Sequence, residues 1–113
     1  GWSTVEAPRD LAGALAASDG AGVRLVDCLT LWLANMGREA DTAALCRALG
    51  EQISPVVLVT NELGMGIVPK DRETRWFRDA HGWMNQAVAK QASEVWISIS
   101  GMPLQLKPGR NGI

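Results

Sequence analysis

The chain has 113 residues, of which 47% are hydrophobic and 20% are charged, with a formal net charge of −1 at pH 7. This composition is typical of one ordinary globular domain. Eleven basic residues are interspersed with twelve acidic ones, which argues against nucleic acid as a partner. The apolar runs are too short for a membrane span and no signal-peptide pattern is present, so we expect a cytoplasmic protein.

The two cysteines, Cys28 and Cys46, belong to no Cys-x-x-Cys motif and have no flanking histidines. Isolated cysteines of this kind usually pack as small hydrophobic side chains in a reducing compartment. The spacing therefore does not predict a structural zinc site.

The chain begins with a predicted helix followed by a predicted strand. Pro8 suits the first position of a helix over residues 8–17, in which Leu11 and Leu15 are spaced four apart. Residues 23–29 are apolar at nearly every position, which is typical of a parallel strand covered on both faces. The sequence thus predicts a helix-to-strand connection at its start.

Two further helices and a second strand follow. Thr30 can cap a short helix over residues 31–36, and a longer helix is expected over about residues 40–52. The run of aliphatic residues at 55–59 predicts another buried strand. Strands separated by helices indicate parallel βα units.

The last part of the chain contains the strongest helix signal. Asp71 is a suitable N-cap for a helix over residues 71–92. Alternation predicts a strand at 94–100, then a possible fourth strand at 101–107 and a turn or disordered tail at 108–113. Along the predicted helix, apolar residues recur at helical spacing and are expected to form its core face: Trp76, Phe77, Ala80, Trp83, Met84, Ala87 and Val88.

Three strands joined by helices predict an α/β fold in three layers with a mainly parallel sheet and right-handed crossovers. Ligands bind such folds beyond the carboxyl ends of the strands. Polar residues that follow the predicted strands are therefore candidates for a site: Asp27, Thr30, Thr60, Asn61, Glu62 and Ser100.

Asp27 closes a hydrophobic strand, as does the Walker B acid that holds Mg²⁺ opposite nucleotide phosphates. A structural role as a helix cap or hydrogen-bond anchor is common for such an acid and is the interpretation that the pattern alone favours. The phosphate loop that accompanies a Walker B acid, GxxxxGK[ST], does not occur in the 113 residues. The residues by themselves therefore predict part of a nucleotide-binding fold without its phosphate loop.

Several stretches resemble one family in order and spacing. They are WSTVEAP, LVDCLTLWLAN, VVLVTNELGMGIVP, RWFRDAHGWMNQAVA and EVWISISGMPLQLK, which together cover nearly the whole chain. They resemble the carboxyl-terminal two thirds of the bifunctional adenosylcobinamide kinase/adenosylcobinamide-phosphate guanylyltransferase of cobalamin biosynthesis. The resemblance implies a P-loop NTPase-like fold and a homotrimer.

The same resemblance implies an enzyme with two activities. It phosphorylates adenosylcobinamide with GTP or ATP, then transfers GMP from GTP to adenosylcobinamide phosphate through a guanylated histidine, giving adenosylcobinamide-GDP. The family's phosphate loop and guanylated histidine would both precede Gly1, so residues 1–113 are expected to be a single incomplete domain, with no catalytic residue of its own and inactive alone. His81 is not expected to replace the nucleophile, because a lone histidine on a helix is usually a surface or packing residue.

The resemblance assigns two residues to the bound GTP. Glu6, in WSTVE, matches an acid that contacts the guanosine nucleotide, and Asp27 matches the acid of the Walker B-like strand, where it is a candidate Mg²⁺ ligand. For Glu6, the alternative is a solvated acid near a helix start. Asn61 and Glu62 are candidates for contact with substrate, and a structural turn that holds the crossover is the alternative.

Two other classes of function remain open from the sequence. One is a different P-loop kinase or nucleotide hydrolase that shares the Walker B-like strand. The other is a non-catalytic nucleotide-binding or assembly module.

Overall fold

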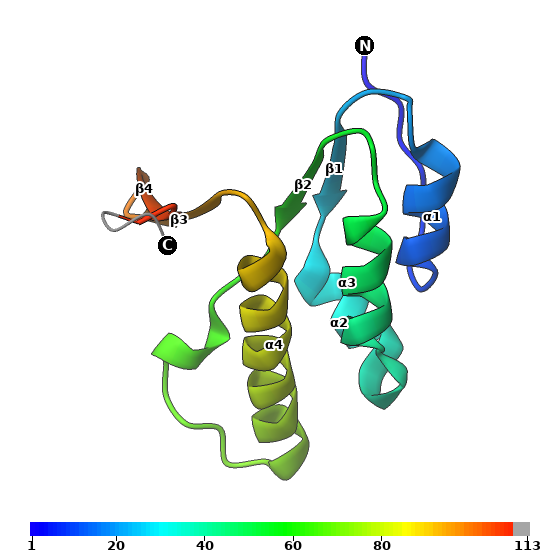
Figure 1. The fold of residues 1–113 in the computed structure, drawn as a ribbon. Helices are drawn as coiled ribbons and strands as arrows, with labels where there is room; N and C mark the ends of the chain where they lie inside the picture. The colour runs from blue at the N-terminus through cyan, green and yellow to red at the C-terminus, as the bar shows by residue number, and fades with distance from the viewer. Residues whose placement is uncertain (110–113) are drawn as a thin grey trace.

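The computed structural model describes residues 1–109, which form both helices and strands (Figure 1). Residues 110–113, part of the predicted tail, lie outside the described residues. All the helices and strands that the sequence predicts are present. Their bounds are α1 (Leu11–Ser18), β1 (Arg24–Asp27), α2 (Leu29–Met36), η1 (Gly37–Glu39), α3 (Thr42–Gly50), β2 (Val56–Val59), η2 (Leu63–Met65), α4 (Arg72–Gln91), β3 (Val95–Ile99) and β4 (Met102–Lys107), where η marks a 3₁₀ turn.

Aspartate side chains set the starts of the first and the longest helix. Helix α1 begins at Leu11 because Asp10 is its N-cap and accepts a hydrogen bond from the backbone N–H of Gly13 at 2.9 Å. The prediction that Pro8 is the first helical residue is therefore wrong. The predicted N-cap of α4 is confirmed, since the carboxylate of Asp71 accepts from the first-turn N–H groups.

Helix α2 starts earlier than predicted. It begins at Leu29, and its N-cap residue is Cys28, whose side chain makes no capping hydrogen bond. The prediction that Thr30 caps this helix is wrong, because Thr30 lies inside the first turn. Its hydroxyl contacts the ring of His81 instead, and this contact belongs to the candidate site.

Strands β1 and β2 pair in parallel and in register. Arg24 lies opposite Val56, and Asp27 lies opposite Val59. The two strands therefore end at the same level, and the residues that follow them start from one edge of the sheet.

The parallel pair is covered on one face only within residues 1–109. The apolar side chains on the other face are exposed: 54% for Leu25, 50% for Val57 and 41% for Val59. The prediction of strands buried on both faces in a three-layer arrangement is thus not met in the described part of the chain. Alternating exposure along both strands is the pattern of a sheet with one packed face.

The third predicted strand does not join the parallel sheet. Strand β3 pairs antiparallel with β4, which confirms the fourth strand and corrects the expected three parallel strands. The cause is the two-residue turn Ser100–Gly101, where both φ angles are positive, 54° and 77°. Such turns match the twist of a tight hairpin. Ser100 therefore lies in the hairpin turn, which Figure 1 shows apart from β1 and β2, and not at the edge of the parallel sheet.

Of the residues predicted for the core face of helix α4, Phe77, Ala80, Met84 and Val88 do pack in the core, whereas Trp83 and Ala87 are exposed. Its buried residues are His81, Met84 and Val88, and Phe77 packs partly against the same core. Trp83, predicted as core, is 66% exposed. Successive intervals of four, three and four residues along the helix place His81 on the same buried face as Phe77, Met84 and Val88. Trp83 lies outside this face. No helix formed by residues 1–109 is long and apolar enough to cross a membrane.

One hydrophobic core joins the four α-helices. Its buried members are Leu11, Leu15, Leu29, Trp32, Leu33, Leu45, Met84 and Val88, against which Val26, Val56 and Leu58 of the parallel strands pack. The free thiol of Cys46 lies partly buried against this core, and Cys28 is likewise free and half-buried.

A polar cluster lies at the amino-terminal ends of the parallel strands. One guanidinium nitrogen of Arg24 donates to the carbonyl of Leu15 at 2.8 Å, and the other donates to Gln52 Oε1 at 2.9 Å and to the Ser54 carbonyl at 3.0 Å. Asp19 lies in an ion pair with Arg24 at 3.4 Å. This cluster connects the turn after α1 to the segment that enters β2.

We predict that Leu45→Ala lowers the free energy of unfolding by about 2–5 kcal/mol, because the side chain is buried in the core and its removal leaves a cavity. Urea denaturation followed by circular dichroism measures the change. Arg47→Ala on the exposed side of the same helix is the matched control and should change stability by no more than about 0.5 kcal/mol. Equal losses in the two variants would contradict the assignment of Leu45 to the core.

We predict that Asp19 makes the protein less stable in acid. Backbone hydrogen bonds from Ser54 and Ile53, with the charge of Arg24, hold the pKa of this carboxyl below its usual 3.8. A lowered folded-state pKa means that the stabilisation is complete above the unfolded-state pKa and is lost as the pH falls through the folded-state pKa.

Thermal midpoints of wild type and Asp19→Asn, measured from pH 7 down to pH 2.5, test this prediction. The wild type should melt higher at pH 7, and the difference should shrink as the pH falls below 3.8. Glu51→Gln, at an exposed carboxylate, controls for the loss of one negative charge. A difference that stays constant with pH would show that the Asp19 charge has no part in it.

Candidate functional site

The candidate site lies at the carboxyl edge of the parallel sheet. Asp27 ends β1, and Thr60, Asn61 and Glu62 follow directly after β2. Because Asp27 pairs in register with Val59, these residues leave the sheet at the same level. The structure therefore brings four of the predicted site residues, Asp27, Thr60, Asn61 and Glu62, to one edge.

Hydrogen bonds connect this edge to helices α2 and α4. Asn61 Nδ2 donates to Thr30 Oγ1 at 3.0 Å, and Thr30 Oγ1 lies 2.7 Å from His81 Nε2. Thr60 Oγ1 donates to Asn85 Oδ1 at 2.8 Å, and Asn85 Nδ2 donates to the carbonyl of Asn61 at 2.8 Å. We call these five residues, Thr30, Thr60, Asn61, His81 and Asn85, the strand-end network.

His81 is the one buried polar or charged residue among residues 1–109, with 1% of its surface exposed. Its Nε2 also lies 3.4 Å from Thr60 Oγ1, and its Nδ1 lies 3.4 Å from Asn85 Nδ2. Burial lowers the pKa of the imidazole, and the nearby charge of Glu62 opposes this change only in part. The ring is therefore neutral near pH 7, and of the two expected roles the packing role is confirmed.

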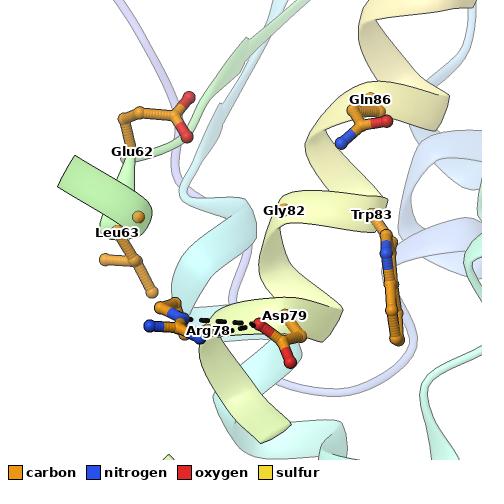
Figure 2. A pocket seen from close by; sticks show the side chains of 8 residues that line it. Glu62, Leu63, Arg78, Asp79, Gly82, Trp83 and Gln86 are labelled. Atoms are coloured by element: carbon orange, nitrogen blue, oxygen red, sulfur yellow. Dashed lines mark hydrogen bonds and ion pairs between the residues drawn. The ribbon is translucent and has the colours of Figure 1, made fainter. Parts of the chain in front are cut away.

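Beyond the network, the chain forms an exposed loop that faces α4. Glu62 begins the loop, and η2 follows it. The loop and α4 line an open pocket of about 220 Å³, with Glu62, Leu63 and Gly64 on one side and Arg78, Asp79, Gly82, Trp83 and Gln86 on the other. Figure 2 shows the two sides and the ion pair between Arg78 and Asp79 at 3.2 Å. The pocket combines carboxylates, a guanidinium, an amide and an indole ring, so it offers both hydrogen-bonding groups and a flat apolar surface.

Asp27 contributes an exposed carboxylate to the edge. Within the described chain no group of three His, Cys, Asp or Glu side chains could enclose a metal ion. Mg²⁺ is often held by only one or two protein carboxylates, together with water and substrate phosphates. The donors at this edge therefore fit a Mg²⁺ ion that arrives with a nucleotide, and do not form a site made by protein alone.

Glu6 is placed differently from the other predicted site residues. It is exposed in an extended segment before α1, and the segment is attached to the last turn of α2: Asn35 Nδ2 donates to the Pro8 carbonyl at 3.0 Å, and Arg9 donates to the Asn35 carbonyl at 2.7 Å. The hydrogen bonds formed by residues 1–109 include none between Glu6 and the strand-end network. Its contact with a nucleotide stays a prediction.

Sequence reasoning did not identify Asn85 or His81 as part of the site. Both lie on α4, more than 50 positions after Thr30 of α2, and spacing along the chain gives no sign that these two helices are in contact. A polar side chain on the buried side of an amphipathic helix was the available signal, because buried polar groups need hydrogen-bond partners.

The chain matches the family described as cobinamide kinase / cobinamide phosphate guanyltransferase over residues 1–106. It is 39% identical to the bifunctional adenosylcobalamin biosynthesis protein CobP of Pseudomonas aeruginosa, with 94% of this chain and 66% of the relative covered. It is 40% identical to CobU of Salmonella typhimurium, with 74% of this chain and 57% of the relative covered. For CobU of Escherichia coli the identity is 37%, with 75% and 58% covered.

The chain thus spans between 57% and 66% of the length of these relatives. The family match nevertheless extends over both parallel strands, the strand-end network and the loop beside α4. The chain belongs to the cobinamide kinase / cobinamide phosphate guanyltransferase family.

Proposed function

We propose that the full-length protein phosphorylates adenosylcobinamide with GTP or ATP and then transfers GMP from GTP to the product, forming adenosylcobinamide-GDP. The family match over residues 1–106 is the observation that supports both activities. The guanylated histidine of this proposal lies outside residues 1–113, because the single histidine of this chain is buried in the strand-end network. The alternatives, another P-loop kinase or nucleotide hydrolase and a non-catalytic nucleotide-binding or assembly module, have no observation in their favour.

Asp27 is the proposed contact to the nucleotide and its Mg²⁺ ion. Its carboxylate is exposed at the strand end, where a metal ion that bridges phosphate oxygens can be reached. When bound, Mg²⁺ neutralises the negative charge on the phosphoryl groups. Glu6 is the proposed acceptor for hydroxyl or amino donors of the guanosine.

Asn61 and Glu62 are the proposed contacts to the cobinamide substrate. Asn61 is oriented by its bond to Thr30, and Glu62 forms one wall of the pocket beside α4. A carboxylate there can accept a hydrogen bond from a substrate hydroxyl and hold it near the phosphates. Chemistry of this kind depends mainly on positioning and charge stabilisation.

We test the function with the full-length protein, adenosylcobinamide and GTP labelled on its α-phosphate. Wild type should form both adenosylcobinamide phosphate and adenosylcobinamide-GDP, and acid-labile label on the polypeptide should mark a phosphorus–nitrogen bond to histidine. We predict that Asp27→Asn lowers kcat for phosphorylation about 100-fold, since it removes the charge that holds the metal ion.

Asp41→Asn is the matched control, because asparagine caps a helix as well as aspartate and Asp41 is the N-cap of α3. It should retain wild-type rates. Absence of both products from wild type would disprove the proposed function. Wild-type rates in Asp27→Asn would remove only the role of that residue.

We further propose that the protein has a P-loop NTPase-like three-layer fold and assembles as a homotrimer in the cytoplasm. The apolar face of β1 and β2 that is exposed within residues 1–109 supports this proposal, because a parallel sheet is normally covered by other elements on both faces. Analytical ultracentrifugation of the full-length protein should give three times the mass of one chain. A monomer at micromolar concentration would contradict the trimer.

A further inference from the structure

Asn85 is the residue of α4 that holds the start of the exposed loop. It is half-buried and makes two short hydrogen bonds to consecutive residues: it accepts from the hydroxyl of Thr60 and donates to the carbonyl of Asn61, both at 2.8 Å. One amide therefore binds both a side chain and the backbone at the point where the chain leaves β2. Paired bonds of this kind restrain direction as well as distance.

The loop after this point has little packing of its own. Met65 is 77% exposed, Ile67 is 96% exposed and Val68 is 63% exposed. Loops with few buried contacts open at low cost in free energy. The position of Glu62, next to Asn61, therefore depends on the hydrogen bonds that hold Thr60 and Asn61.

Asn85 is itself restrained by its surroundings. It lies one helical turn after His81, whose Nδ1 is 3.4 Å from its amide nitrogen, and its neighbour Met84 is buried in the core with 1% exposed. The same helix supplies Arg78 and Gln86 to the pocket that Glu62 closes from the other side. Helix α4 thus both forms one wall of the pocket and, through Asn85, places the other wall.

We infer that Asn85 is a positioning residue: it fixes Thr60 and Asn61 against α4 and so sets where Asn61 and Glu62 meet the cobinamide substrate. The inference rests on the proposed function for its effect on catalysis. It does not involve the nucleotide, whose proposed contacts are Asp27 and Glu6. Loss of Asn85 therefore disturbs use of the corrinoid and leaves nucleotide binding unchanged.

The test compares Asn85→Ala with Gln91→Ala in the full-length protein. Gln91 lies on the same helix and donates from its amide to the carbonyl of Cys46 at 2.7 Å, so its variant loses a similar bond away from the loop. Hydrogen–deuterium exchange of the amides of residues 61–66 should become about 10-fold faster in Asn85→Ala and stay at the wild-type rate in Gln91→Ala.

Kinetics supply the second readout. The kcat/KM for adenosylcobinamide should fall about 10- to 100-fold in Asn85→Ala, while the Kd for GTP stays at the wild-type value. Asn85→Asp has nearly the same shape and keeps an acceptor for Thr60, but cannot donate to the Asn61 carbonyl. It should therefore behave like Asn85→Ala in both readouts.

Faster exchange together with a selective loss of corrinoid turnover supports the inference. Exchange at the wild-type rate in Asn85→Ala overturns it, as does faster exchange with unchanged kcat/KM, because the bonds would then be only structural. If wild type makes neither product, the proposed function fails and the role of Asn85 in its catalysis falls with it. The exchange data still decide separately whether Asn85 holds the loop.

Discussion

The in-register parallel pairing of β1 and β2 is the constraint on which the rest of the structure depends. Because Asp27 lies opposite Val59, the residues that follow both strands begin at one level. At the other end, Arg24 binds α1, the turn that follows it and the segment that enters β2. A shift by one residue would turn the apolar side chains of a strand from the core to the exposed face.

Helix α4 completes the candidate site at this edge of the sheet. Its apolar face packs in the core, and on the same helix His81 and Asn85 bind the residues that leave the sheet. The exposed loop then closes a pocket against the outer side of α4. Stability and positioning are thus linked, since the packing that buries α4 also fixes the amide that orients the loop.

The order of helices and strands could be predicted because each depends on local pattern and capping, as at Asp71. The hairpin of β3 and β4 was missed as a sheet of its own because pairing partners depend on the Ser100–Gly101 turn. Trp83 was placed in the core because hydrophobicity alone does not reveal which side of a helix the tertiary contacts cover. For the same reason, the sequence does not show that the side chain of His81 is buried.

The sequence by itself determined the α/β pattern, the resemblance to a family and the set of polar residues that end the strands, since all three are properties of neighbouring residues. Only the tertiary structure decided which polar residues meet. Thr30, Thr60 and Asn85 come from three separate elements, and their hydrogen bonds form only once the helices pack on the sheet. Contacts between distant segments depend on packing geometry, which spacing along one chain does not encode.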